Sequence, residues 1–181
     1  AGARLIFHPT PISGVMVIEP ERLEDERGFF ARSFCADQFL RHRLNPELNQ
    51  CSISFNHKAG TLRGMHYQAA PFAEAKLVRC TQGAIYDVAL DLRRDSPTYK
   101  AWFAQELSAD NRLMLYIGEG IAHGFQTLSD NAEVFYQIST HYHPEASRGV
   151  RWNDPAFAIR WPLTDTSSMS ERDRQYPDYR P

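Results

Sequence analysis

The sequence predicts an all-β protein, an antiparallel sandwich or small barrel that forms a single domain over residues 1–181. Short segments rich in Val, Ile, Phe and Tyr recur along the chain between turn residues, which is typical of antiparallel strands. Helical periodicity is scarce outside residues 36–44. The 11 prolines are spread over the intervening loops, so no Pro-rich linker divides the chain.

Composition and charge exclude several classes of protein. The 181 residues suit one domain with a real core, and the net charge of −2 provides no broad basic surface for DNA or RNA. No apolar run approaches the ~20 residues of a membrane span, and the N-terminal segment lacks the apolar stretch of a signal peptide. The 3 cysteines form no CxxC pair, so a reducing, cytoplasmic compartment is expected.

The first half of the chain is expected to form strands around one helix. SGVMVIEPERL is a strand that runs into a charged loop, and FFARSF is a second strand. ADQFLRHRL, with apolar Phe39 and Leu40 between charges, is the helix candidate. QCSISF alternates polar and apolar groups, as a half-buried strand does.

The segments KLVRC and GAIYDVALDL are predicted to form the two arms of a hairpin, with the turn at residues 81–83. Strict alternation sorts the second arm into two faces. One face carries Tyr86, Val88, Leu90 and Leu92, and the other carries Ile85, Asp87, Ala89 and Asp91.

The second half continues with the strands WFAQEL, LMLYI and EVFYQIS and the Gly-rich segment GEGIAHGFQTL. Alternation in EVFYQIS places Val134 and Tyr136 on one face and Phe135 and Gln137 on the other. Residues 141–181 are rich in Pro, Asp and Arg and are expected to form loops with one short helix.

The segment TLRGMHYQ carries a cation and an imidazole that a plain barrel wall does not need. Strict alternation sends Arg63 and His66 to opposite faces of a strand. Gly64, which lies between them, permits a bulge or bend that relieves this separation. Taken alone, the segment also fits a structural histidine beside a surface arginine.

Other polar residues fit either a ligand site or an ordinary barrel. His123 lies between small residues that leave room for a ligand, although a loop histidine has the same pattern. Lys76 opens the apolar strand KLVRC, where it either points along a cavity or caps the strand end. Tyr136 and Tyr142 fit core tyrosines with a polar tip at the rim as well as site residues.

The motifs argue against a metal and against nucleophilic hydrolysis. Gln68 stands where an HxH pair with His66 would need its second histidine. The HxH pair that does occur, His141 and His143, comes directly before Pro144 and has no matching carboxylate pattern. There is no GxSxG elbow, GxGxxG or P-loop. The remaining His, Lys, Tyr, Arg and Asp residues suit proton transfer at a carbon next to a carbonyl group.

The same residues carry a resemblance to a known family. The stretches DERGFFARSF, GTLRGMHYQ, KLVRC, EGIAHGFQTLS, YHPEASRGVRWNDP and SERDRQYP resemble, in order, the dTDP-4-dehydrorhamnose 3,5-epimerase family of the cupin class. The resemblance implies a cupin-type jelly-roll β-barrel with a few short helices, usually a dimer that exchanges strands. It also implies inversion of carbons 3 and 5 of a 4-keto-6-deoxy sugar on a nucleoside diphosphate, with no cofactor and no metal.

The resemblance implies a role for each matching position. His66 would be the base, with Asp173 as its partner, and Tyr136 would be the acid on the opposite face of the sugar. Lys76 would steady the enolate oxygen. The positions that hold the sugar, the diphosphate and the nucleotide would be Arg27, Phe30, Gln50, Ser52, Arg63, His123 and Tyr142.

Two positions depart from the family pattern, both on the nucleotide side. Arg32 stands where the family usually has Glu, and Ser52 stands near an expected Asn, which leaves the nucleotide base open. Relatives that invert only carbon 3 or only carbon 5 keep the same residues. A metal-dependent cupin enzyme and a non-catalytic sugar-nucleotide binding module are the alternative classes.

The expected partners are the nucleotide-sugar substrate and a second copy of the chain, with no nucleic acid and no membrane. The homodimer is predicted because the strands QCSISF and VMVIEP have free edges that need pairing.

Overall fold

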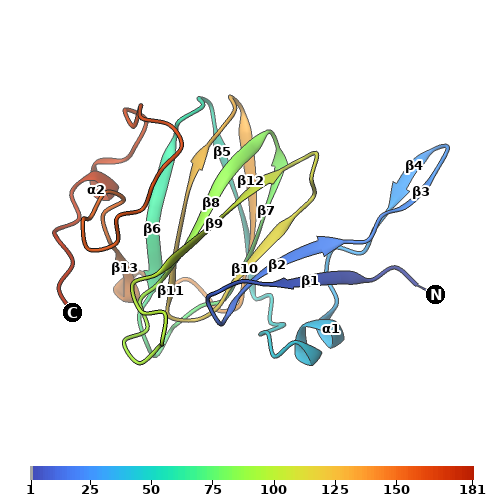
Figure 1. The fold of residues 1–181 in the computed structure, drawn as a ribbon, viewed down its shortest axis with the longest axis horizontal. Helices are drawn as coiled ribbons and strands as arrows, with labels where there is room; N and C mark the ends of the chain where they lie inside the picture. The colour runs from blue at the N-terminus through green and yellow to red at the C-terminus, as the bar shows by residue number, and fades with distance from the viewer. Residues whose placement is uncertain (1) are drawn as a thin grey trace.

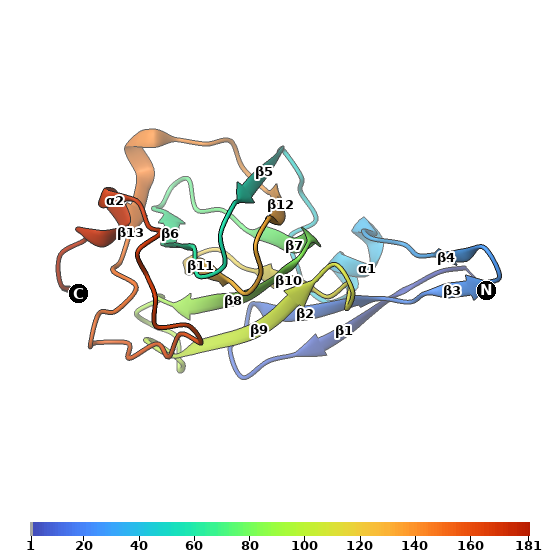
Figure 2. The same ribbon diagram turned by 90° about the horizontal axis from the view of Figure 1, so that it is seen from above.

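The computed structural model describes residues 2–181 and contains two large antiparallel β-sheets that enclose a common core. Figure 1 shows helix α2 (Glu171–Arg174) at one end of the molecule and the hairpin of β3 (Leu23–Asp25) and β4 (Gly28–Phe30) at the other. In Figure 2 this hairpin extends away from the body, beyond helix α1 (Ala36–Arg41).

The larger sheet has six strands, all paired antiparallel. In spatial order they are β1 (Leu5–Pro9), β2 (Val15–Pro20), β10 (Met114–Ile117), β7 (Lys76–Gln82), β12 (Ala132–Ile138) and β5 (Gln50–Asn56).

The smaller sheet has five strands, and from β5 onward the chain passes repeatedly from one sheet to the other. This double-sheet arrangement is that of a jelly roll, so the all-β prediction is confirmed. In spatial order the strands are β13 (Ser147–Gly149), β6 (Leu62–Gln68), β11 (Ile121–Thr127), β8 (Ala84–Asp91) and β9 (Trp102–Ser108).

The predicted hairpin of KLVRC and GAIYDVALDL is wrong, because β7 and β8 belong to different sheets. Gly83 connects them with a φ of +76°, and a Cβ there would collide with Ser129 Oγ and lie 3.3 Å from Ala132 Cα. The turn is therefore where the sequence predicts it. It leads the chain across to the second sheet instead of back along a neighbouring strand.

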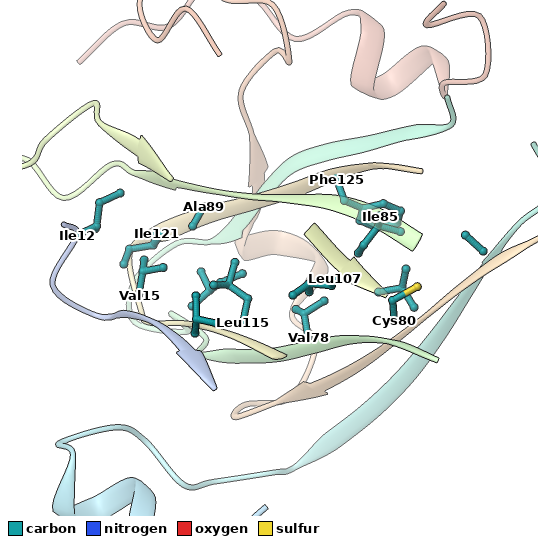
Figure 3. Close-up of a cluster of buried hydrophobic side chains, with 14 residues drawn as sticks. Ile12, Val15, Val78, Cys80, Ile85, Ala89, Leu107, Leu115, Ile121 and Phe125 are labelled. Atoms are coloured by element: carbon teal, nitrogen blue, oxygen red, sulfur yellow. The ribbon is translucent and has the colours of Figure 1, made fainter. Parts of the chain in front are cut away.

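The main core lies between the two sheets, as Figure 3 shows. Val78 and Leu115 contribute to it from the larger sheet, and Ile85 and Phe125 from the smaller one. Full burial of an aliphatic or aromatic side chain of this size contributes roughly 1.5–3 kcal/mol to stability. These contacts hold the sheets together and set the spacing of any site between them.

The alternation predicted for β8 is confirmed. Ile85 and Ala89 belong to the core between the sheets. Val88 and Leu90 pack on the other face of the smaller sheet, against Phe157 of the C-terminal segment. The loop-rich C-terminal region thus covers the outer face of the smaller sheet, and α2 forms its one short α-helix.

Helix α1 covers part of the outer face of the larger sheet. It was predicted at residues 36–44 and ends at Arg41. Its buried Phe39 belongs to a cluster with Leu77 and Met114 of the sheet. No helix within the described part of the chain is long and apolar enough to cross a membrane.

The two edges of the larger sheet are β1 and β5. The prediction of a free edge on VMVIEP is wrong, because β2 lies between β1 and β10. QCSISF, which forms β5, is an edge strand as predicted, and Ile53 and Phe55 remain 62% and 41% exposed on it. An edge with exposed apolar side chains is a surface that pairs readily with another chain.

Strands β6 and β11 approach each other closely at Gly64 and Gly124. Gly64 has a φ of +126°, and a Cβ there would lie 2.6 Å from Gly124 Cα and 2.9 Å from the His123 carbonyl oxygen. A Cβ on Gly124 would in turn lie 2.8 Å from the Arg63 carbonyl oxygen. Only glycine at both positions permits this backbone contact.

The close approach coincides with a shift in strand register. His123 pairs with His66, whereas Phe125 pairs with Arg63. The irregularity that the sequence predicts at Gly64 is confirmed, and it allows Arg63 and His66 to face the same pocket.

We expect Gly64→Ala to destabilise the protein by about 2 kcal/mol or more, because alanine is strained at this φ and meets backbone atoms of β11. Chemical denaturation of the purified variant measures this change. Gly2→Ala is the control, since a Cβ at Gly2 meets no atom within 4 Å. Equal stability of the two variants would contradict the assigned backbone contact.

Candidate active site

A pocket of about 320 Å³ is lined by strands of both sheets. β5, β7 and β12 contribute from the larger sheet, and β6 and β11 from the smaller one. Most of the predicted site residues lie in its wall: Gln50, Ser52, Arg63, His66, Lys76, His123, Tyr136 and Tyr142.

His66 and Asp173 form a hydrogen-bonded pair beside this pocket. His66 Nε2 lies 2.7 Å from Asp173 Oδ1. The other carboxylate oxygen accepts a hydrogen bond from the Gly64 amide at 3.1 Å. Ser170 caps α2 by accepting a hydrogen bond from the Asp173 amide, which fixes the helix that carries the carboxylate. The Asp173 side chain is only 6% exposed, whereas 41% of the His66 side chain is exposed.

The surroundings of Asp173 keep its carboxyl group ionised. Burial on its own raises the pKa of a carboxylic acid, but the hydrogen bonds from His66 and from the Gly64 amide outweigh burial, so the pKa of Asp173 is lowered. A carboxylate on one ring nitrogen fixes the orientation and the tautomer of the imidazole.

Arg63 is held in the pocket by neutral groups. Its Nε donates to Asn56 Oδ1 at 2.7 Å, and its Nη2 donates to the Phe55 carbonyl at 3.3 Å. Asn56 is itself buried and donates to the Ala132 carbonyl. Because these partners are uncharged, the positive charge of Arg63 stays available to an anionic ligand.

Lys76 and Glu74 form an ion pair in the pocket wall. Lys76 Nζ lies 3.2 Å from Glu74 Oε1, and the two side chains are 10% and 12% exposed. Lys76 is the first residue of β7, so the strand positions its ammonium group at the pocket.

His123 and Asp87 form a second histidine–aspartate pair, which is fully buried. His123 Nε2 lies 2.6 Å from Asp87 Oδ1, and the two side chains are 4% and 0% exposed. Burial raises the pKa of Asp87, although His123 and the charge of Lys76 partly offset that effect. Within the described chain, the other oxygen of Asp87 has no hydrogen-bond partner.

Tyr136 faces the pocket from β12, on the same side as buried Val134, as the alternation predicts. Its hydroxyl lies 3.0 Å from Ser54 Oγ, and its ring packs edge-on to that of His123 at 6.1 Å. Burial raises the pKa of Tyr136 to about 12, so the phenol is protonated at neutral pH.

The remaining pocket positions lie on β5 and in the segment after β12. Gln50 Oε1 accepts a hydrogen bond from the Tyr142 amide at 2.7 Å, which ties the two segments together. Tyr142 as a residue is 60% exposed, so its ring is accessible for contact. Ser52, next but one to Gln50, also lines the pocket.

Two predicted binding residues lie elsewhere. Arg27 and Phe30 are on the β3–β4 hairpin that extends from the body in Figure 2, and neither lines the pocket. The Arg27 side chain is hydrogen-bonded to Asp25 beside it, and Phe30 is 66% exposed. Arg32, the departure from the family pattern, donates to the Ala3 carbonyl at 3.1 Å.

The sequence interpretation missed the roles of Ser54 and Glu74 in the pocket wall and of Asp87 behind His123. Ser54 follows Gln50 and Ser52 in the alternation of β5, which was a usable signal. Asp87 stands among apolar residues on the core face of β8, and a carboxylate there requires a buried partner. Glu74 lies in a loop and has no periodicity that predicts its position.

The HxH pair is not arranged as a metal site. The His143 ring stacks on Phe72 at 3.6 Å, and its Nδ1 lies 3.2 Å from Glu145 Oε1. Over residues 2–181, no group of three or more His, Cys, Asp or Glu side chains is placed to hold a metal ion.

A candidate base and a candidate acid line the pocket from opposite sheets. His66 extends from the smaller sheet and Tyr136 from the larger one, so a molecule between the sheets meets them on different sides. Lys76 provides a cation at the same pocket. This arrangement suits removal of a proton from one face of a carbon and delivery to the other.

The fold and the pocket together define a cupin-type isomerase that moves protons at carbon. A sequence model described as dTDP-4-dehydrorhamnose 3,5-epimerase matches residues 9–180 of the chain. The chain belongs to the dTDP-4-dehydrorhamnose 3,5-epimerase family.

Three relatives illustrate the similarity. The dTDP-4-dehydrorhamnose 3,5-epimerase of Sinorhizobium fredii is 40% identical over 173 residues, which cover 96% of this chain and 89% of the relative. The crystal structure of the Bacillus anthracis enzyme with TDP and PPi bound has a TM-score of 0.93 and 39% identity, and covers 97% of this chain and 100% of that chain. The 3'-monoepimerase ChmJ of Streptomyces bikiniensis, in complex with dTDP-quinovose, has a TM-score of 0.87 and 31% identity, and covers 94% of this chain and 86% of that chain.

We expect the contribution of Asp173 to stability to depend on pH. Its pKa is lower in the folded state than the ~3.9 of a free aspartate, so its stabilising effect is present above that value and disappears as pH falls through the lower folded pKa. Urea denaturation of Asp173→Asn and wild type at pH 6 and near pH 3 measures this. The difference in free energy of unfolding between the two proteins should shrink at the lower pH. Asp178→Asn serves as the control, because the Asp178 side chain is 74% exposed. A pH-independent difference would refute the assignment.

Proposed function

We propose that the protein inverts carbons 3 and 5 of a dTDP-linked 4-keto-6-deoxy sugar by successive deprotonation and reprotonation next to the ketone. The observation that carries this proposal is the opposition of His66 and Tyr136 across the pocket, on strands of facing sheets. The family to which the chain belongs supports the substrate class.

In the first step His66 takes the proton from the carbon next to the ketone. The C–H electron pair forms the C=C bond of an enolate, and the carbonyl π electrons move to the oxygen as negative charge. Asp173 holds Nε2 of His66, so Nδ1 is the ring nitrogen that receives the proton. The Lys76 ammonium, whose side chain is only 10% exposed, offsets the charge on the enolate oxygen.

In the second step Tyr136 gives a proton to the opposite face of the same carbon, which inverts its configuration. A pKa of about 12 keeps the phenol protonated until the enolate forms, and Ser54 holds its hydroxyl. Exchange with water restores the proton to Tyr136 and removes it from His66. The same pair then acts on the second carbon after the sugar shifts in the pocket.

The remaining pocket groups suit the rest of the substrate. Arg63 carries a positive charge without a carboxylate partner and suits the diphosphate, and His123 lines the same pocket. Gln50, Ser52 and Tyr142 suit the sugar and the nucleotide at the open side of the pocket.

The alternative activity is inversion of carbon 3 alone. The similarity to a 3'-monoepimerase supports this alternative, because proteins with the same fold include both 3,5-epimerases and a 3'-monoepimerase. The two activities differ in whether the sugar is repositioned between proton transfers, and the experiment below distinguishes them.

Proton NMR of the protein with dTDP-4-keto-6-deoxyglucose in D2O tests the proposal. Wild type should exchange deuterium into C3 and C5 and form the inverted product. Tyr136→Phe keeps the ring and removes only the hydroxyl, so it should still exchange protons while the inverted product falls by ~100-fold or more. His66→Ala should lose exchange at both carbons.

Each departure from these results has a definite meaning. Exchange at C3 alone in wild type would establish the monoepimerase alternative. Activity of His66→Ala within about threefold of wild type would remove His66 from the mechanism, because a general base is worth roughly 10²–10⁴-fold. Normal inversion by Tyr136→Phe would make Tyr136 a packing residue.

We also propose a homodimer in which the β3–β4 hairpin of each copy completes the pocket of the other. Arg27 and Phe30 extend from the body on this hairpin, away from the pocket of their own chain. The exposed edge strand β5, with Ile53 and Phe55, supports pairing with a second copy.

Mixing two inactive variants tests this dimer. His66→Ala lacks the base, and Phe30→Ala lacks the hairpin ring. If hairpins are shared, each mixed C2 dimer has one complete site out of two. Equal amounts of the two variants give about half mixed dimers on co-refolding, so the mixture recovers about a quarter of wild-type activity. A monomer by light scattering, or no recovery in a verified mixed dimer, would contradict the proposal.

We infer a cytoplasmic location as the compartment for this activity. Cys35, Cys51 and Cys80 carry free thiols, and such thiols persist in reducing compartments.

A further inference from the structure

Glu74 is a carboxylate in the pocket to which the proposed mechanism assigns no role. It precedes β7 by two residues and lines the pocket with His66, Lys76 and Tyr136. Its Oε1 lies 3.2 Å from Lys76 Nζ, and its side chain is only 12% exposed. A buried carboxylate beside an anionic substrate is unfavourable for binding unless a cation neutralises it.

We propose that Glu74 is a positioning residue that holds the Lys76 ammonium at the pocket wall, where charge develops on the enolate oxygen. This inference rests on the proposed function, because it requires Lys76 to face an enolate. Glu74 acts through Lys76 and transfers no proton itself.

The chemistry of lysine explains why such a partner is needed. The ammonium group is a strongly hydrated point charge on a flexible four-carbon stem, with three N–H donors. Burial of this group without a counter-charge is costly, so an unpaired Lys76 would turn toward water. Glu74 occupies one side of the ammonium and leaves the other donors for the ligand.

No other carboxylate near the pocket forms an ion pair with Lys76 in the described part of the chain. Asp87, on which the charge of Lys76 also acts, is bound to His123 at 2.6 Å and is fully buried in β8. Asp173 is bound to His66 and to the Gly64 amide. Glu74 is therefore the carboxylate through which the protein sets the position of Lys76 before the substrate binds, which is the preorganisation that favours a developing negative charge.

Glu74→Gln keeps the shape of the side chain and removes its charge. We expect kcat for epimerisation to fall about tenfold while KM stays within about threefold, because the lost interaction matters mainly when the enolate forms. Glu74→Asp keeps the charge and should retain more of kcat than Glu74→Gln. Glu133→Gln is the matched control, since Glu133 is bound to Thr81 outside the pocket, and it should match wild type.

The same change should have the opposite sign when Lys76 is absent. In Lys76→Met the Glu74 carboxylate has no counter-charge and repels the enolate. Adding Glu74→Gln to Lys76→Met should therefore raise kcat above that of Lys76→Met alone, by about threefold. A residue that bound the substrate directly would lower kcat in both backgrounds.

The inference is overturned if Glu74→Gln equals or exceeds wild type, if Glu74→Asp is no better than Glu74→Gln, or if kcat falls in both backgrounds. Circular dichroism and thermal melting establish that each variant is folded, and the Lys76→Met pair remains informative if Glu74→Gln alone is unstable. Failure of the proposed function gives a different result. Wild-type exchange by Lys76→Met would remove Lys76 from the mechanism, and no exchange by wild type in D2O would remove the epimerisation itself.

Discussion

The pocket depends on the close contact of two backbones, those of β6 and β11 at Gly64 and Gly124. A regular strand would send Arg63 and His66 to opposite faces, one into the pocket and one away from it. The register shift at this contact brings both residues to the same pocket, opposite strands of the larger sheet. The Gly64 amide also donates to Asp173, so the same irregularity orients the carboxylate behind His66.

Two histidines and the lysine of the pocket have carboxylate partners before any ligand binds, whereas Arg63 is held by neutral groups. His66 is bound to Asp173 and Lys76 to Glu74, while a second histidine is bound to the buried carboxylate of Asp87. Fixed partners leave little reorganisation for the moment at which an enolate forms, and charges on largely buried side chains act more strongly than charges in water. In this respect the pairs around the pocket matter as much as the groups that face the substrate.

The pocket and the proposed nucleotide end of the site differ in whether a single chain supplies all of their residues. The groups proposed for proton transfer come from strands that the core holds in place, and one chain assembles them. The hairpin with Arg27 and Phe30 extends away from the body, so the nucleotide end depends on the proposed second copy. Of the two family departures, Arg32 follows this hairpin, whereas Ser52 lies on β5 in the pocket wall of its own chain.

The sequence by itself determined the strand faces, because alternation is a local property, and its resemblance to the family indicated most of the pocket residues. The two faces of β8 and the inward side of Tyr136 followed from period-two patterning alone. Which strands lie side by side was decided only by the tertiary structure, since a turn at Gly83 suits a hairpin and a crossover equally well. The geometry of His66 with Asp173 likewise depends on the distance between two segments that lie far apart in the chain, and local patterns carry no information about such a distance. Glu74 reaches Lys76 from a loop that has no periodicity, so the sequence did not indicate this pair either.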